Sequence, residues 1–192
     1  MTKPLPKTDE ALVLRTDFSN DEAWNKLCEA IKHNSRSADG LPLELKIAGA
    51  PIEQDVETAV RAAAATTANI VYAGPVYGAT KLELLEWADI VALPSSYRSE
   101  AQPLCLLEGA LAGCYLIASR VGYISDLASD LHVYLLEDTS PAAIASAFGT
   151  LTANDVRASG AANREFAQAH YTISAFTATF AASIADFLVQ PR

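Results

Sequence analysis

Two glutamates, Glu100 and Glu108, are the residues of this chain whose setting most suggests chemistry. The segment 103–112 is expected to form a helix that is apolar on every side except at Glu108, with Pro103 suited to its first turn. At helical spacing Glu108 shares a face with the leucines three and four residues away, namely Leu104, Leu107 and Leu111. Burying an unpaired carboxylate is very costly. We therefore expect Glu108 either to find a partner or to face a cleft. The alternative is a core helix with one glutamate that reaches solvent at its edge.

The start of this helix is a second candidate feature. The backbone amides of Leu104 and Cys105 fall in the first turn, where N–H groups have no partner within the helix. Free amides at a helix N-terminus suit an anionic ligand such as a phosphate.

The overall charge and the cysteines exclude several classes of protein. The chain has 192 residues and a formal net charge of -9, whereas nucleic-acid-binding domains are usually basic. The negative charge also disfavours binding to an anionic membrane surface. Three cysteines, an odd number in apolar or helical contexts, are typical of reduced thiols in a cytoplasmic protein: Cys28, Cys105 and Cys114. Neither a signal peptide nor a membrane span is expected.

Predicted strands and helices alternate along the chain. Short apolar runs predict six strands, at 11–16, 43–48, 69–73, 90–93, 115–119 and 133–136. The segments between them predict helices at 21–33, 52–67, 80–88, 103–112 and 141–151, followed by a terminal helix pair over 154–188, broken near Tyr171. We expect a single domain over 1–192, with an extended segment at 1–10. The alternation is typical of an α/β fold with a doubly wound, Rossmann-like parallel sheet of six strands and helices on both faces. Ligands of such sheets bind beyond the carboxyl ends of the strands.

Several common site motifs are missing from the sequence. No G-x-G-x-x-G follows the first strand, so a nicotinamide or flavin fingerprint is absent, and no phosphate loop with Lys-Ser or Lys-Thr is present. The three histidines are scattered, no cysteine has the spacing of a metal ligand, and no serine lies in a nucleophile elbow. We therefore expect neither a bound cofactor nor a metal ion.

The segment around the two glutamates resembles a known family. The residues that carry the likeness are Trp87–Ser95, Glu100 and Glu108 with seven residues between them, Ala110–Gly113 and Ile117–Ser119. They resemble the family 4 glycosyltransferases, and more closely the carboxyl-terminal domain of that GT-B-fold family, where the nucleotide-sugar donor binds. The likeness extends over residues 43–188 and includes the turn at 74–78.

The resemblance implies roles for individual residues. Glu100 matches the glutamate beside the hydroxyls of the transferring sugar, and is the catalytic candidate. The implied donor-binding residues are Arg15, Val76, Tyr77, Lys81, Leu104, Cys105 and Glu108. Among them, Glu108 matches the acceptor of hydrogen bonds from the ribose, and Val76 with Tyr77 matches the turn that touches the base. Lys81 matches a basic position near the nucleotide.

The resemblance also implies an activity, which is transfer of a hexose from a nucleotide diphosphate sugar, a UDP- or GDP-sugar, with retention of configuration. Such enzymes are usually independent of metal ions, and positive groups stabilise the departing diphosphate. Because no second set of strands precedes residue 11, we expect the acceptor to be bound by a separate domain or by a second copy of the chain. Part of the aromatic stripe of the terminal helices is then expected to be exposed.

The sequence departs from the family pattern at the start of the first helix. Glu22-Ala23 stands where members usually carry Lys-Gly, and a carboxylate facing a diphosphate weakens binding. A non-catalytic or degenerate domain that binds a nucleotide sugar or an assembly partner is therefore one alternative. A flavodoxin-like regulatory domain of similar topology is another.

Overall fold

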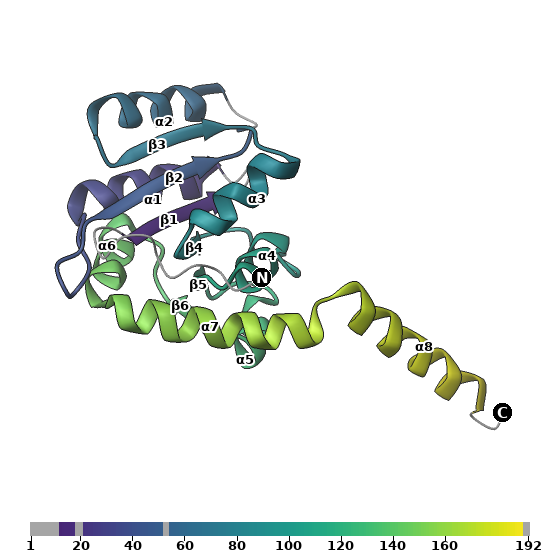
Figure 1. Ribbon diagram of the computed structural model, residues 1–192. Coiled ribbons are helices and arrows are strands. Elements are labelled where there is room, and N and C mark those ends of the chain that lie inside the picture. The colour runs from purple at the N-terminus through teal and green to yellow at the C-terminus, as the bar shows by residue number, and fades with distance from the viewer. Residues whose placement is uncertain (1–11, 18–20, 52–53, 190–192) are drawn as a thin grey trace.

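The computed structural model describes the backbone of residues 12–17, 21–51 and 54–189 and the side chains of residues 23–51 and 54–185. Within these residues, six parallel strands form one sheet (Figure 1). The strands are β1 (Leu12–Asp17), β2 (Leu43–Ala48), β3 (Ile70–Gly74), β4 (Ile90–Leu93), β5 (Tyr115–Ser119) and β6 (Val133–Leu136). The helices are α1 (Asp21–His33), α2 (Gln54–Thr66), α3 (Gly78–Trp87), α4 (Leu104–Ala112), α5 (Ile124–Asp130), α6 (Pro141–Thr150), α7 (Ala153–His170) and α8 (Ile173–Val189).

The strand order is β3-β2-β1-β4-β5-β6, which confirms the predicted doubly wound sheet. The order reverses between β1 and β4, where Leu14 pairs with Ile90 and Arg15 with Val91. Ligands of open α/β sheets bind in the crevice beyond the carboxyl ends of the strands at such a reversal. A flavodoxin-like sheet has the order 2-1-3-4-5, so that alternative is excluded.

Each face of the sheet carries its own apolar cluster, as expected for helices on both faces. Along β4, Ile90 and Ala92 belong to a cluster that includes residues of α1, α2 and α6. Val91 and Leu93 belong to a second cluster, with residues of α4, α5 and α7. All four side chains are at most 1% exposed. A central parallel strand is buried on both faces, which is why its sequence is a continuous apolar run rather than an alternating one.

Two predictions about the helices were wrong in detail. The sequence analysis assigned no helix to α5, whose seven residues contain three apolar side chains and offer too short a periodic pattern. Pro103 was expected inside the first turn of α4, but it is the N-cap, with an extended backbone (ψ 115°). The helix therefore begins at Leu104, and the carbonyl of Pro103 accepts from the amide of Leu106 at 3.0 Å.

All three cysteines are buried and form no disulfide, in agreement with the expected free thiols. Burial raises the pKa of the Cys28 thiol to about 11. Because the thiolate is the reactive form, a thiol with so high a pKa is chemically inert at neutral pH.

Asn163 fastens α7 to the amino-terminal ends of β5 and β6. Its side chain is fully buried, and its amide group donates to the carbonyls of Cys114 and His132, both at 3.1 Å. Its side-chain oxygen accepts from the amide of His132 at 2.7 Å.

Asn163→Ala is therefore expected to lower the free energy of unfolding by about 1–3 kcal/mol, because it leaves buried backbone groups without partners. Urea denaturation of the variant measures this loss. Gln168→Ala, at an exposed position of the same helix, is the control and should change stability little. A loss no larger than in the control would contradict the fastening role of Asn163.

The last helix, α8, extends away from the body of the molecule (Figure 1). As predicted, part of the aromatic stripe is exposed: Phe176 is 67% and Phe180 57% exposed, and their rings stack on each other with centroids 5.8 Å apart. Phe187 also belongs to the aromatic stripe predicted for the terminal helices, but its side chain lies outside the described residues. Among the described helices, none is both long and apolar enough to cross a membrane.

Candidate functional site

The candidate residues gather around two neighbouring helices, α3 and α4, that pack on the same side of the sheet. Each helix begins beyond the carboxyl end of a strand, α3 after β3 and α4 after β4. Val76 and Tyr77 lead into α3, which carries Lys81. Leu104 and Cys105 begin α4, which carries Glu108. The fold thus brings together Lys81 and Glu108, which lie 27 positions apart in the sequence.

Glu108 has the partner that its apolar setting required. The ammonium of Lys81 donates to Oε1 of Glu108 at 2.7 Å, and the two side chains are 30% and 33% exposed. The other carboxylate oxygen, Oε2, is buried and has no hydrogen-bond partner among the described residues. A buried, unsatisfied oxygen of this kind is rare in proteins and marks a strained or functional group. Glu108 thus has a partner, as one of the two expectations required, and its side chain is also partly exposed.

Glu100 is held in place through two buried serines. The hydroxyl of Ser95, directly after β4, donates to Oε1 of Glu100 at 2.8 Å and accepts from the amide of Tyr97 at 3.1 Å. The hydroxyl of Ser119, the last residue of β5, donates in turn to the carbonyl of Ser95. Ser95 is 0% and Ser119 1% exposed. These serines orient the carboxylate, and the sequence analysis did not assign them a role.

The backbone of Glu100 is fixed from the other side by the turn after β5. The carbonyl of Glu100 accepts from the amide of Tyr123 at 2.8 Å. Gly122 has a φ of 52°, and a Cβ there would lie 2.0 Å from the carbonyl oxygen of Glu100. Only glycine permits this close approach, so the loop that carries Glu100 and the loop at Gly122 form one unit.

The remaining donor-binding candidates differ in how far their side chains are exposed to solvent. Tyr77 is the N-cap of α3 and is 79% exposed, while Val76 beside it is half-buried. Leu104 is 67% exposed at the first position of α4, and the Cys105 side chain is buried behind it. The start of α4 is therefore accessible through the Leu104 position.

The structure does not test the predicted role of Arg15 or the effect of Glu22, but it describes a cation in the first helix. Arg15 lies in β1, but its side chain and that of Glu22 lie outside the described residues. Lys26, one turn after Glu22 and on the same side of α1, is described. Its ammonium donates to the hydroxyls of Ser96 at 2.8 Å and Thr139 at 2.9 Å, in the loops after β4 and β6. Lys26 was not among the predicted site residues, although its spacing of four residues from Glu22 would have indicated it.

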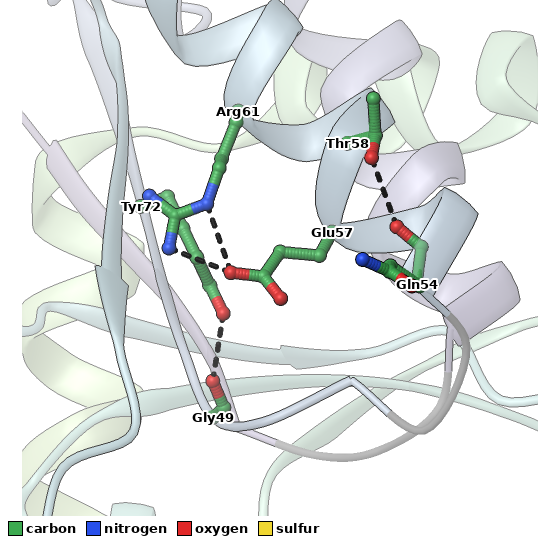
Figure 2. Close-up of polar contacts among 6 residues, drawn as sticks. All are labelled: Gly49, Gln54, Glu57, Thr58, Arg61 and Tyr72. Atoms are coloured by element: carbon green, nitrogen blue, oxygen red, sulfur yellow. Dashed lines mark hydrogen bonds and ion pairs between the residues drawn. The ribbon is translucent and has the colours of Figure 1, made fainter.

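A cluster of polar contacts joins residues of α2 and β3 and extends to Gly49, which follows β2 (Figure 2). The hydroxyl of Tyr72 donates to the carbonyl of Gly49 at 3.1 Å, and the Arg61 guanidinium lies 4.8 Å from the centre of the Tyr72 ring. Arg61 also pairs with Glu57 through two bonds of 2.8 and 2.6 Å. Burial raises the pKa of the Tyr72 phenol. In these bonds Glu57 pairs with Arg61, and Tyr72 binds the carbonyl of Gly49. We therefore assign the cluster a role in the fold and not in ligand binding.

A cavity of about 290 Å³ lies beside the loop of Glu100, but its lining does not suit a phosphate. It contains the carboxylates of Asp126 and Asp130 together with Tyr123 and Tyr171, and none of the described residues that line it is basic. Two carboxylates repel an anion, which makes this cavity an unfavourable place for a phosphate. Across the part of the chain that the structure describes, no group of three or more His, Cys, Asp or Glu residues is arranged to hold a metal ion.

The order of the strands defines a doubly wound α/β domain, a class of fold whose ligands bind at the carboxyl ends of the strands. The profile of the family described as "Glycosyl transferases group 1" matches residues 12–154. The chain therefore belongs to the group 1 glycosyltransferases. No curated protein matches the chain in a direct comparison of sequences.

Solved structures share the fold at low sequence identity. The carboxyl-terminal domain of LpcC, a group 1 glycosyltransferase from Francisella tularensis, is 18% identical with a TM-score of 0.64, and the match covers 85% of this chain and 87% of that one. Sucrose-phosphate synthase from Thermosynechococcus elongatus is 20% identical with a TM-score of 0.69, and the match covers 94% of this chain and 46% of that one. HepE from Anabaena, solved with UDP and glucose, is 17% identical with a TM-score of 0.69, and the match covers 90% of this chain and 48% of that one. The chain thus spans about half the length of the last two proteins.

Proposed function

We propose that this chain is the donor-binding half of a retaining family 4 glycosyltransferase, which takes a hexose from a UDP- or GDP-sugar in the cytoplasm. The observation that carries the proposal is the ion pair of Lys81 with Glu108 on α4, the helix that follows β4 at the reversal of strand order. HepE has the same fold and was solved with UDP and glucose, which supports a nucleotide sugar as the ligand class.

Each part of the site has a role in this proposal. Glu108 accepts hydrogen bonds from the ribose hydroxyls, and Val76 with Tyr77 contacts the base. The first amides of α4, at Leu104 and Cys105, face the diphosphate, because a helix N-terminus stabilises negative charge. That charge grows as the bond between the sugar and the diphosphate breaks, so donors already in position lower the barrier. Arg15 is the proposed side-chain cation at this point.

Glu100 completes the donor site. Ser95 and Ser119 hold its carboxylate in one orientation, so it can accept hydrogen bonds from the hydroxyls of the transferring hexose. Fixing the sugar in this way limits its motion during transfer. The acceptor hydroxyl must come from elsewhere, and we assign it to a separate acceptor-binding domain or a second copy of the chain.

A domain that binds a nucleotide sugar without transferring it is the second candidate. Glu22-Ala23 at the position where the family usually has Lys-Gly favours it, because a carboxylate there opposes the diphosphate. The two candidates share the donor site and differ only in turnover.

The proposal is tested by titrating the purified chain with UDP, GDP, UDP-glucose and GDP-mannose in a calorimeter. We expect saturable binding of one nucleotide family, with the diphosphate and its sugar both bound. Absence of binding to all four ligands would contradict both candidates. An assay of the bound donor with simple sugar acceptors then separates them, since steady transfer supports the transferase and binding alone supports the second candidate.

A further inference from the structure

The Lys81 ammonium lies at the Glu108 carboxylate, and its position indicates which part of a bound nucleotide it can affect. Its Nζ atom lies 2.7 Å from Oε1 of Glu108, which is the fifth residue of α4. At a rise of about 1.5 Å per residue, Glu108 lies roughly 6 Å along the helix from Leu104, the first helical residue. The ammonium is thus held at a residue about one helical turn beyond Leu104 and Cys105, whose amides are the ones that would face an anion.

We infer that Lys81 is a positioning residue, which acts on a bound nucleotide through Glu108 and does not contact the phosphates. The inference rests on the proposed function, because it assigns a role at the same donor site. It differs from the expectation that Lys81 itself is a basic contact of the nucleotide.

The unsatisfied oxygen of Glu108 explains why a positioning residue is needed. Oε2 is buried, and none of the described residues is its hydrogen-bond partner; a buried carboxylate oxygen in that state destabilises the conformation that contains it. Without a cation on Oε1, the carboxylate gains by turning toward water, where both of its oxygens can accept hydrogen bonds. The Lys81 ammonium opposes this change, so Glu108 stays in one orientation.

A pre-oriented carboxylate favours a ligand that donates hydrogen bonds. Lys81 binds Oε1, the side chain of Glu108 is 33% exposed, and a carboxylate oxygen can accept more than one hydrogen bond. A ribose hydroxyl can therefore join the ammonium there without displacing it. A phosphate would compete with Glu108 for the ammonium and would meet the carboxylate as a like charge. The pair consequently selects the nucleoside part of the ligand.

The test compares a nucleoside with its diphosphate. Uridine and UDP, or guanosine and GDP if the chain prefers guanine, are titrated against the parent, Lys81→Met, Lys81→Arg, Glu108→Gln and the double variant Lys81→Met/Glu108→Gln. The titrations are made at about 1 M salt, where the Debye length is about 3 Å and the ammonium no longer acts on the phosphates from a distance. Melting temperatures check that each variant is folded.

We expect Lys81→Met to weaken the binding of the nucleoside and the binding of its diphosphate by the same factor, roughly tenfold. In the Glu108→Gln background the same substitution should have no further effect, because coupled residues are not additive. Lys81→Arg, which keeps a cation near Glu108, should recover most of the affinity.

Two results would overturn the inference while leaving the proposed function intact. One is a loss of affinity for the diphosphate that is many times the loss of affinity for the nucleoside, which would show that Lys81 contacts the phosphates. The other is an undiminished effect of Lys81→Met in the Glu108→Gln background. If the parent binds neither the nucleoside nor the diphosphate, the proposed function fails and the role of Lys81 fails with it.

Discussion

Replacing Gly122 with alanine is expected to lower the free energy of unfolding by about 2–5 kcal/mol. Two terms contribute: a left-handed backbone costs an alanine about 1–2 kcal/mol, and an overpacked contact about 1–3 kcal/mol. The contact is severe here, because the new Cβ would lie 2.0 Å from the carbonyl oxygen of Glu100 and 2.9 Å from its carbonyl carbon. Backbone atoms cannot move aside as the end of a flexible side chain can. The loop that carries Glu100 must therefore shift or the turn must open.

Gly40→Ala is the matched control for this substitution. Gly40 also has a positive φ, 84°, but no atom lies within 4 Å of a Cβ built there. The control therefore measures the backbone term alone. Thermal and urea unfolding of both variants gives the difference, which reports the contact with Glu100. An equal loss of stability in the two variants would show that the loops at Gly122 and Glu100 are not in close contact.

The strands were predictable because burial dictates their composition. β2, β4, β5 and β6 begin and end at the predicted residues, and β1 and β3 each lie one residue further along the chain than predicted. In a sheet covered on both faces nearly every strand residue must be apolar, so a short apolar run between turn residues is a sufficient signal. Helix ends were less certain, as at Pro103, because an N-cap and a first-turn position accept similar residues.

The site was predictable only where one residue conflicted with its surroundings. Glu108 among leucines required a partner or a cleft, and the structure supplies a partner. That the partner is Lys81, 27 residues earlier in the chain, follows from the packing of α3 against α4 and from no local pattern. The serines that hold Glu100 give no sequence signal of their own, because serines are common at the ends of strands. Ser95 and Ser119 become recognisable once β4 and β5 are known to be neighbours, with Leu93 opposite Ala118.

The largest functional effect is expected at Glu108. Glu108→Gln should weaken nucleotide binding by roughly 1.5–3 kcal/mol, which is the strength of a hydrogen bond to a charged group. The amide keeps the size of the side chain and one acceptor oxygen. The Lys81 ammonium should attract that oxygen, so the NH₂ group takes the buried position where Oε2 has no partner. Ribose hydroxyls then meet a weaker, neutral acceptor.

Folding should change little in Glu108→Gln. Both members of the ion pair are about one third exposed, and partly solvated pairs of this kind contribute at most about 1 kcal/mol. Glu86→Gln is the control, because it removes the same charge from an exposed position on α3. Calorimetric titration of both variants with the preferred nucleoside diphosphate separates a direct contact from a general change of charge. Since both variants raise the net charge by one unit, only a contact at Glu108 can make their affinities differ. Equal affinities in Glu108→Gln, Glu86→Gln and the parent would remove Glu108 from the binding site and leave the start of α4 as the remaining candidate.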